Sequence, residues 1–204
     1  MKEIRSRQKK RRINFREERK LILLGVEGKN RSEFLYFKNF NSLQNRYHIK
    51  KVFGNNTHLQ GIINEMKTYI KNNGLSDGDL LYCLFDMDFD KNKMKNIQKI
   101  IKENKLPIRF LPSNPCFEVF LLFHFAFTTK QFENFGQLER ELKKHLPNYR
   151  KGENYFELLE PLADVCIKNC DKVLAHHNAC EHDFCDMNPS TNAHELVKIL
   201  KDIK

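Results

Sequence analysis

The stretch Cys83-Leu84-Phe85-Asp86-Met87-Asp88-Phe89-Asp90 decides how the rest of the chain is interpreted. It closes an apolar run that follows a turn-rich segment at 74–78, a pattern typical of a strand buried in a sheet. Residues two apart in a strand point to the same side, so Asp86 and Asp88 are expected to share one face. Crowded carboxylates raise each other's pKa unless a cation lies between them, and Mg²⁺ prefers such oxygen ligands. The alternative is a solvated acidic loop in which Asp90 caps the next helix.

Strand and helix patterns alternate around this stretch. Buried strands are predicted at 21–26, 47–53, 79–85 and 108–111, and amphipathic helices at 31–40, 59–70 and 94–101. This alternation predicts an α/β fold, a parallel sheet flanked by helices. Glu27 then follows the first strand as Asp86 and Asp88 follow the third. All three acids are expected at the carboxyl edge of the sheet, where open α/β sheets place their sites.

A fourth carboxylate, Glu118, lies in the segment 112–125. Asn114 followed by Pro115 fits an N-cap with proline at the first helical position, which makes Glu118 the fourth helical residue. Glu118 is then either a structural residue near the positive end of the helix or a further acid entering the site. His124 is expected to be a core histidine held by hydrogen bonds.

Beyond residue 128 the pattern is helical, with apolar stripes that begin near Leu138 and Phe156, and a last helix that starts near 188–191. We therefore divide the chain into a basic arm at 1–20, an α/β core at 21–127 and a helical extension at 128–204. The extension is interpreted as packed on the core and not as a separate domain.

The chain has 204 residues and a formal net charge of +10, and much of that charge is near the N-terminus. Residues 1–20 hold ten Lys or Arg against three Glu. Such an arm can bind a phosphate backbone with little sequence preference, and a disordered solubilising tail is the alternative. The candidate nucleic-acid contacts are Lys9, Lys10, Arg11, Arg12 and Lys29.

No apolar run is long enough for a membrane span, and the N-terminus lacks the apolar segment of a signal peptide. We therefore expect a cytoplasmic protein without membrane contact, with reduced cysteines. Thiols and imidazoles gather between 166 and 185, but their spacing departs from common zinc patterns. We expect partly buried cysteines and exposed histidines there, with a structural Zn²⁺ site as the alternative.

Several of these segments together resemble the RloB-like proteins. The segments are Val26-Glu27-Gly28, Phe85-Asp86-Met87-Asp88, Ser113-Asn114-Pro115-Cys116-Phe117-Glu118 with Leu121-Leu122-Phe123-His124-Phe125, Tyr149-Arg150-Lys151 and Asn188-Pro189-Ser190-Thr191. The resemblance covers roughly residues 20–204. It departs at Phe120, where the family often has Trp, and this change keeps the bulk of the side chain.

RloB-like proteins are associated with bacterial anti-phage loci, including an abortive-infection system whose other component is an ATPase. Their core resembles the Toprim fold, in which a glutamate after the first strand and a DxD motif form a Mg²⁺-dependent phosphodiester site. The resemblance matches Glu27 to that glutamate, and Asp86 and Asp88 to the DxD motif. Glu118 belongs to the RloB-like motif, and its catalytic role is our inference from its expected place. Lys151 is either a residue that stabilises phosphate charge or assists proton transfer, or an ordinary surface lysine.

The resulting expectation is a nuclease that needs Mg²⁺ or Mn²⁺ and cleaves DNA or RNA, transfer RNA included. Its expected metal ligands are Glu27, Asp86, Asp88 and Glu118. Glu27 could instead act as a general acid or base, with its pKa raised by the neighbouring acids. A non-catalytic regulator that binds nucleic acid and a partner ATPase is the alternative, and nucleotidyl transfer would use the same metals. A homo-oligomer is also compatible with the sequence.

Overall fold

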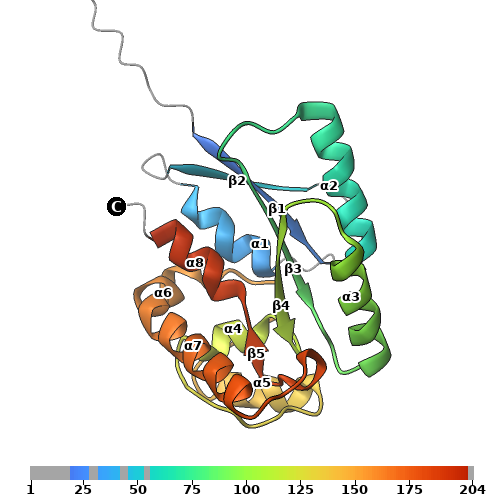
Figure 1. Ribbon diagram of the computed structural model, residues 1–204. Coiled ribbons are helices and arrows are strands. Elements are labelled where there is room, and N and C mark those ends of the chain that lie inside the picture. The colour runs from blue at the N-terminus through green and yellow to red at the C-terminus, as the bar shows by residue number, and fades with distance from the viewer. Residues whose placement is uncertain (1–18, 28–31, 42–45, 53–55, 202–204) are drawn as a thin grey trace, which may run out of the picture.

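A computed structural model gives the structure of the chain and describes residues 19–27, 32–41, 46–52 and 56–201. The strands found there form one sheet in the order β2-β1-β3-β4-β5. They are β1 (Lys20–Val26), β2 (Tyr47–Lys51), β3 (Leu80–Asp86), β4 (Ile108–Asn114) and β5 (Ser190–Thr191). The first four strands are parallel, and β5 is antiparallel to β4. This mostly parallel sheet confirms the predicted α/β fold (Figure 1).

Helices cover both faces of the sheet, with α2 and α3 on one face and α1, α4, α7 and α8 on the other (Figure 1). The α-helices are α1 (Ser32–Phe37), α2 (Leu59–Asn73), α3 (Lys91–Glu103), α4 (Glu118–Phe123), α5 (Phe135–Lys143), α6 (Phe156–Leu159), α7 (Ala163–Ala179) and α8 (Ala193–Lys201). Short 3₁₀ turns are η1 (Lys38–Phe40), η2 (Glu160–Leu162) and η3 (Phe184–Asp186). No helix in these ranges is both long and apolar enough to cross a bilayer.

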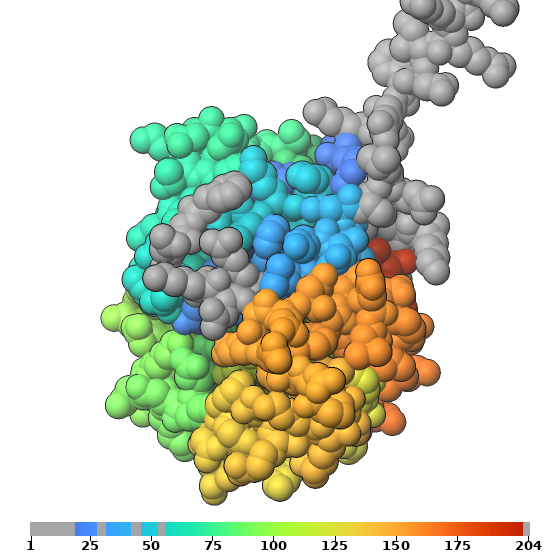
Figure 2. Space-filling model, turned by 180° about the vertical axis from the view of Figure 1, so that it is seen from behind, coloured from blue at the N-terminus to red at the C-terminus, as the bar shows by residue number. Residues whose placement is uncertain are grey.

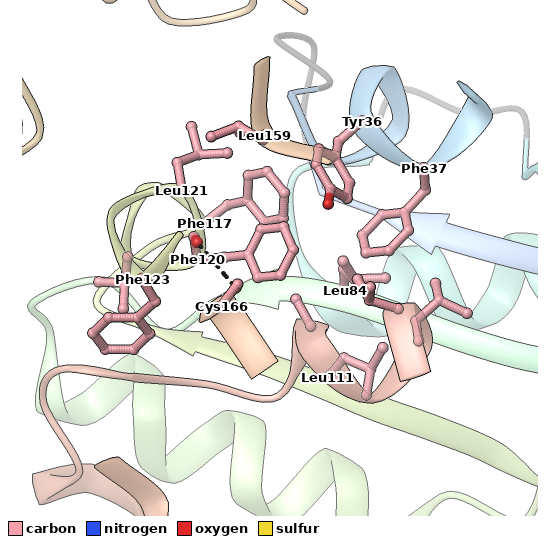
Figure 3. Close-up of a cluster of buried hydrophobic side chains, with 14 of the residues drawn as sticks. Tyr36, Phe37, Leu84, Leu111, Phe117, Phe120, Leu121, Phe123, Leu159 and Cys166 are labelled. Carbon is pink, nitrogen blue, oxygen red and sulfur yellow. Dashed lines mark hydrogen bonds between the residues drawn. The ribbon is translucent and has the colours of Figure 1, made fainter. Parts of the chain in front are cut away.

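Side-chain alternation along the strands divides the core into two clusters. In β1, Ile22 and Leu24 face the α1 and α4 side, whereas Leu23 faces α2 and α3. Aromatic rings dominate the first cluster, where Tyr36 meets Phe120 edge-on with ring centroids 5.1 Å apart (Figure 3). This packing fixes α1 and α4 against the sheet, and both helices carry acids of the candidate site.

The strand order also explains where a site can form. After β1 the chain turns to β2 on one side of that strand, and then crosses to β3 on the other side. The loops that leave the carboxyl ends of β1 and β3 therefore diverge, which is the arrangement that creates a crevice in doubly wound sheets. Glu27 directly follows β1, and Asp86 ends β3.

The predicted helix start at Asn114 is wrong. Asn114 is the last residue of β4 and pairs with Ser190 of β5, a strand that the sequence patterns did not predict. This pairing keeps the chain extended through Asn114, so α4 begins only at Glu118, with Phe117 in the N-cap position. Glu118 is therefore the first helical residue and not the fourth.

The C-terminal half is also less uniformly helical than predicted. Residues 188–191, expected to open the last helix, instead contain β5, and α8 begins at Ala193. The stripe predicted from Phe156 to Cys166 is divided by η2, which contains Pro161. Apolar side chains of α5, α7 and α8 join the same core cluster as those of β1, β3 and β4.

Candidate functional site

The structure brings together acids that follow three different strands. The backbone N–H of Asp86 donates to Glu27 Oε2 at 3.2 Å, which links the ends of β3 and β1. Asp86 Oδ1 in turn accepts from the backbone N–H of Phe117 at 2.9 Å. Phe117 immediately precedes Glu118, so the start of α4 is tied to the end of β3. Three loops at the carboxyl edge therefore form one connected site.

Glu118 is the most enclosed acid of this site. Its residue is 1% exposed, and its Oε1 accepts a hydrogen bond of 2.7 Å from the hydroxyl of Tyr149. Lys151 Nζ lies 3.6 Å from the same oxygen. Glu118 Oε2 is buried and has no hydrogen-bond partner among the described residues. One oxygen of this carboxylate is thus held in place, while the other is buried without a hydrogen bond to the described residues.

Lys151 belongs to the site and is not an unattached surface lysine. Its side chain is half-exposed and pairs with the buried Glu118. Burial lowers the pKa of Lys151, but the carboxylates of Glu118 and Asp86 outweigh this effect, so the net shift is upward. Lys151 therefore carries a positive charge at neutral pH, beside a cluster of acids.

Glu33 is a site residue that the sequence analysis missed. It lies in α1 and is 6% exposed. Burial, with smaller contributions from Glu118 and Glu27, raises the pKa of Glu33 to about 7. The pKa of Asp86 is also raised, first by burial and then by Glu33, Glu118 and Glu27. A signal was available, because Glu33 shares a helix stripe with the buried Tyr36 and Phe37, where an acid is out of place.

The loop that carries Tyr149 and Lys151 is fastened to the start of α1. The backbone N–H of Gly152 donates to Ser32 Oγ at 3.2 Å, next to Glu33. On the molecular surface, α1 and the segment that follows residue 150 lie side by side (Figure 2). Residues more than a hundred positions apart in the sequence therefore close one side of the site.

Asp88 does not share a face with Asp86 as predicted. Asp88 lies beyond the end of β3 and has a φ of 56°, so strand alternation stops before it. Its carboxylate pairs with Lys93 of α3, and Lys93 Nζ also donates to Glu27 Oε1 at 3.1 Å. The acids therefore form two groups. Glu27 and Asp88 surround Lys93, whereas Asp86, Glu33 and Glu118 lie on the side of Lys151.

Asp90 caps α3, as the alternative interpretation of the acidic stretch predicted. Its Oδ1 accepts from the backbone N–H of Asn92 at 2.8 Å and of Lys93 at 3.4 Å. The capping role concerns Asp90 alone and leaves the other acids available to the site. His124 is a core residue as expected, because its Nδ1 lies 2.9 Å from the carbonyl oxygen of Phe120. Burial lowers the pKa of His124 to about 4.

The donor set of the site suits a hard divalent cation. Carboxylate oxygens are the ligands of Mg²⁺, and the unpartnered Oε2 of Glu118 is such a donor. Burial, followed by the neighbouring carboxylates, raises the pKa values of Asp86 and Glu33, and Lys151 offsets this only in part. These carboxylates are nevertheless widely spaced, because no three of them bring ligand atoms within 4.8 Å of one another.

A tighter group of potential ligands lies elsewhere, at Asp171, His194 and Glu195. There Lys198 Nζ lies 2.8 Å from Asp171 Oδ1 and 3.4 Å from Glu195 Oε1. Lysine thus already supplies positive charge to this group. This group joins α7, which carries Asp171, to α8, which carries His194 and Glu195.

The thiols and imidazoles between 166 and 185 are spread over different environments. Cys166 and Cys170 are buried with their sulfurs 3.9 Å apart, whereas Cys180 is exposed. His177 Nδ1 lies 2.8 Å from His182 Nδ1. No three of these side chains bring ligand atoms within 4.8 Å of one another in the described ranges.

The predicted nucleic-acid contacts Lys9, Lys10, Arg11, Arg12 and Lys29 lie outside the residues that the structure describes. The comparisons with known proteins give one match. A family model described as RloB-like protein matches residues 22–200, which is nearly the whole chain. No curated protein and no solved structure matches the chain.

Proposed function

We propose that this chain, which belongs to the RloB-like protein family, is a metal-dependent nuclease that hydrolyses phosphodiester bonds in DNA or RNA. The observation that carries the proposal is the group Asp86, Glu33 and Glu118 at the carboxyl edge of a doubly wound sheet, where Glu33 and Glu118 are buried and Asp86 is half-buried. Crowded buried acids of this kind occur at functional sites, where their charge serves a reaction. The resemblance of Glu27, Asp86 and Asp88 to the Toprim motifs supports the same reaction class.

In this proposal Asp86 and Glu118 hold Mg²⁺ or Mn²⁺, with Glu33 and Glu27 beside them. A bound divalent cation supplies positive charge that polarises the scissile phosphate and stabilises the charge of the transition state. Tyr149 is a positioning residue, since its hydroxyl holds Glu118 Oε1 at 2.7 Å. That contact leaves Glu118 Oε2 to face the ligand.

Proton transfer and phosphate binding fall to two further side chains. Glu33, with its pKa raised to about 7, exchanges a proton readily at neutral pH and can accept one from the attacking water. Lys151 remains protonated and can stabilise negative charge on the phosphate oxygens. The acid or base role first considered for Glu27 passes to Glu33 here, because Glu27 already bonds Lys93 and the N–H of Asp86.

The test is cleavage of supercoiled DNA and of total transfer RNA with Mg²⁺, with Mn²⁺ and with EDTA. Asp86→Asn and Glu118→Gln should reduce cleavage by roughly a hundredfold or more, since each removes a carboxylate at the proposed reacting centre. Asp77→Asn, in an exposed turn, is the matched control and should cleave like the wild type. Cleavage that persists in EDTA, or that both site variants retain, would refute the nuclease.

The second candidate is a regulator that binds nucleic acid and a partner ATPase without cutting. The arrangement of Lys93 favours it, because this lysine neutralises Glu27 and Asp88 without a metal. The same assays, repeated with the neighbouring ATPase and ATP, separate the two functions. Metal-dependent cleavage under any of these conditions favours a nuclease effector of an anti-phage system, whereas intact substrates throughout favour the regulator.

A further inference from the structure

Helix α3 is unusually rich in lysine. Its sequence, KNKMKNIQKIIKE, holds five lysines and one acid, Glu103. Its apolar side chains, including Met94 and Ile97, are buried against the sheet. Lys93 turns toward the acids of the candidate site and pairs with Glu27 and Asp88. The remaining four lysines are exposed to solvent.

These four lysines, Lys91, Lys95, Lys99 and Lys102, form a continuous line that we call the α3 lysine ridge. Their spacing of four, four and three residues places them on one side of the helix. At the rise of an α-helix the ridge is about 16 Å long. A row of cations of this length matches several successive phosphates of a nucleic-acid strand.

Acids neutralise the ridge only in part. Lys91 pairs with Asp186 at 3.2 Å, and Lys99 with Glu103 at 3.9 Å, both in exposed positions where ion pairs are weak. Within the described part of the chain, Lys95 and Lys102 form no ion pair. Helix α5 and the segment after it differ, because Lys143 and Lys144 there each pair with a glutamate of the same helix.

The N-terminal end of the ridge lies close in the sequence to the candidate site. Asp90, which caps α3, comes two residues after Asp88, and Lys91 is the first residue of the helix. Phe89, between these acids, is 40% exposed, so part of its ring is accessible to a ligand. Exposed rings beside basic residues bind unpaired bases by stacking, whatever the base. Phosphates along the ridge and a base on Phe89 would direct a strand toward the acids.

We propose that the α3 lysine ridge binds the backbone of the substrate strand and that Phe89 stacks on an unpaired base near the scissile phosphate. The inference rests on the proposed function and names the surface that its substrate uses. An anionic membrane fits less well, because the outer face of α3 offers lysine, asparagine and glutamine but no apolar side chain to insert. Lys91 and Lys95 of the ridge also line an adjoining cleft, whose other side carries Asp183 and Asp186. Phosphates should therefore lie on the lysine side of this cleft.

The experiment measures binding of labelled oligonucleotides to the full chain in EDTA by fluorescence anisotropy, over a series of salt concentrations. Single strands and duplexes of DNA and RNA are compared. Lys95→Gln/Lys102→Gln should reduce the slope of log K against log salt by about 1.5, since each phosphate contact contributes about 0.7–0.9. The control Lys168→Gln/Lys172→Gln removes two exposed lysines from α7, on the other face of the sheet, and should leave the slope unchanged.

Phe89→Leu provides an independent readout. It should weaken single-strand binding by roughly fivefold or more, with no change in salt slope, because stacking and not charge is lost. An unchanged salt slope in the Lys95/Lys102 variant would contradict the proposal that the ridge binds nucleic acid. A variant that binds anionic lipid vesicles less tightly but binds oligonucleotides like the wild type would contradict it as well. If the Lys95/Lys102 variant and Phe89→Leu bind less tightly but substrates stay intact in the cleavage assay, the ridge is a nucleic-acid-binding surface and the proposed nuclease activity is rejected.

Discussion

Glu33, Asp86 and Glu118 are held where water cannot solvate their charges fully, and this burial determines what each residue can do. Burial is the largest cause of the raised pKa of both Asp86 and Glu33. Glu118 instead has Tyr149 and Lys151 on one oxygen. The enclosure of these carboxylates costs stability, which Lys151 offsets only in part.

Glu33→Gln should reveal this cost through its pH dependence. The pKa of Glu33 is about 7 in the folded chain against 4.5 for the free side chain. The folded state therefore holds the proton more tightly, and the wild type loses stability as pH rises from about 4.5 through 7. Urea unfolding in EDTA measures this. At pH 8 the free energy of unfolding of the variant should exceed that of the wild type by on the order of 1–3 kcal/mol, and at pH 4 the two should be equal. Glu157→Gln, on the exposed side of α6, should show no such trend.

Lys93→Gln should increase the affinity of the site for divalent cations. Lys93 neutralises Glu27 and Asp88, so its removal leaves two carboxylates that a metal can bridge. Titration calorimetry should show Mn²⁺ binding that is roughly tenfold tighter, which corresponds to about 1.4 kcal/mol. Binding of an additional Mn²⁺ ion would have the same meaning. Lys95→Gln changes the same residue type two positions along the helix and should bind Mn²⁺ like the wild type. Equal isotherms for all three proteins would show that Lys93 does not compete with metal.

At the scale of elements, close packing between β1 and α2 fixes the end of the strand that carries Glu27. A Cβ added at Gly25 would lie 2.6 Å from Ile62 Cγ2 and 3.1 Å from Met66 Sδ. Gly25 therefore allows α2 to approach β1 more closely than any other residue would. Glu27 is two residues further along, so its position depends on this contact.

Gly25→Ala should accordingly destabilise the chain by about 1–3 kcal/mol and reduce cleavage as well. Gly136→Ala is the control, because its added Cβ finds its nearest atom at 3.4 Å and the residue lies in α5, where alanine is favoured over glycine. Urea unfolding of the two variants measures the difference. A Gly25→Ala protein as stable as the control would show that α2 can move away at little cost.

At the scale of the whole molecule, the last part of the chain completes the sheet and the core. Ser113 of β4 and Thr191 of β5 share a hydrogen bond of 2.8 Å between their hydroxyls. Leu196, Val197 and Leu200 of α8 belong to the core cluster that contains Ile22 and Leu84. The C-terminal half is therefore expected to unfold together with the strands.

Leu196→Ala tests whether the C-terminal helices and the sheet unfold together. Removing the buried side chain should cost about 2–5 kcal/mol, and amide exchange at Leu24 in β1 should accelerate by the same free energy. Val165→Ala is the matched control, since Val165 lies in α7 but is 43% exposed, and it should change stability by less than about 0.5 kcal/mol. Unchanged exchange at Leu24 in the Leu196 variant would indicate that the C-terminal helices unfold separately.

Local patterns were sufficient to predict the strands, because β1, β3 and β4 are short apolar runs next to turn residues. They failed at β5, which has two residues and no periodicity of its own. That strand forms only because Ser190 and Thr191 meet the end of β4. The same pairing keeps the chain extended through Asn114, so α4 begins at Glu118. Because β5 was not predicted, the start of α4 was predicted wrongly as well.

Hydrophobic patterns were sufficient to predict the α/β class, the order of the first four strands along the chain, and the positions of Glu27 and Asp86 at the ends of two of them. These depend on hydrophobic periodicity, which is a property of neighbouring residues. Long-range folding was needed to establish that Glu33 lies near Asp86, that Asp88 pairs with Lys93, and that Tyr149 and Lys151 reach Glu118. Apart from the Asp88–Lys93 pair, those contacts join distant parts of the chain, such as Tyr149 and Glu118 at a separation of 31 positions. The burial that sets their charges arises only when helices close over the sheet.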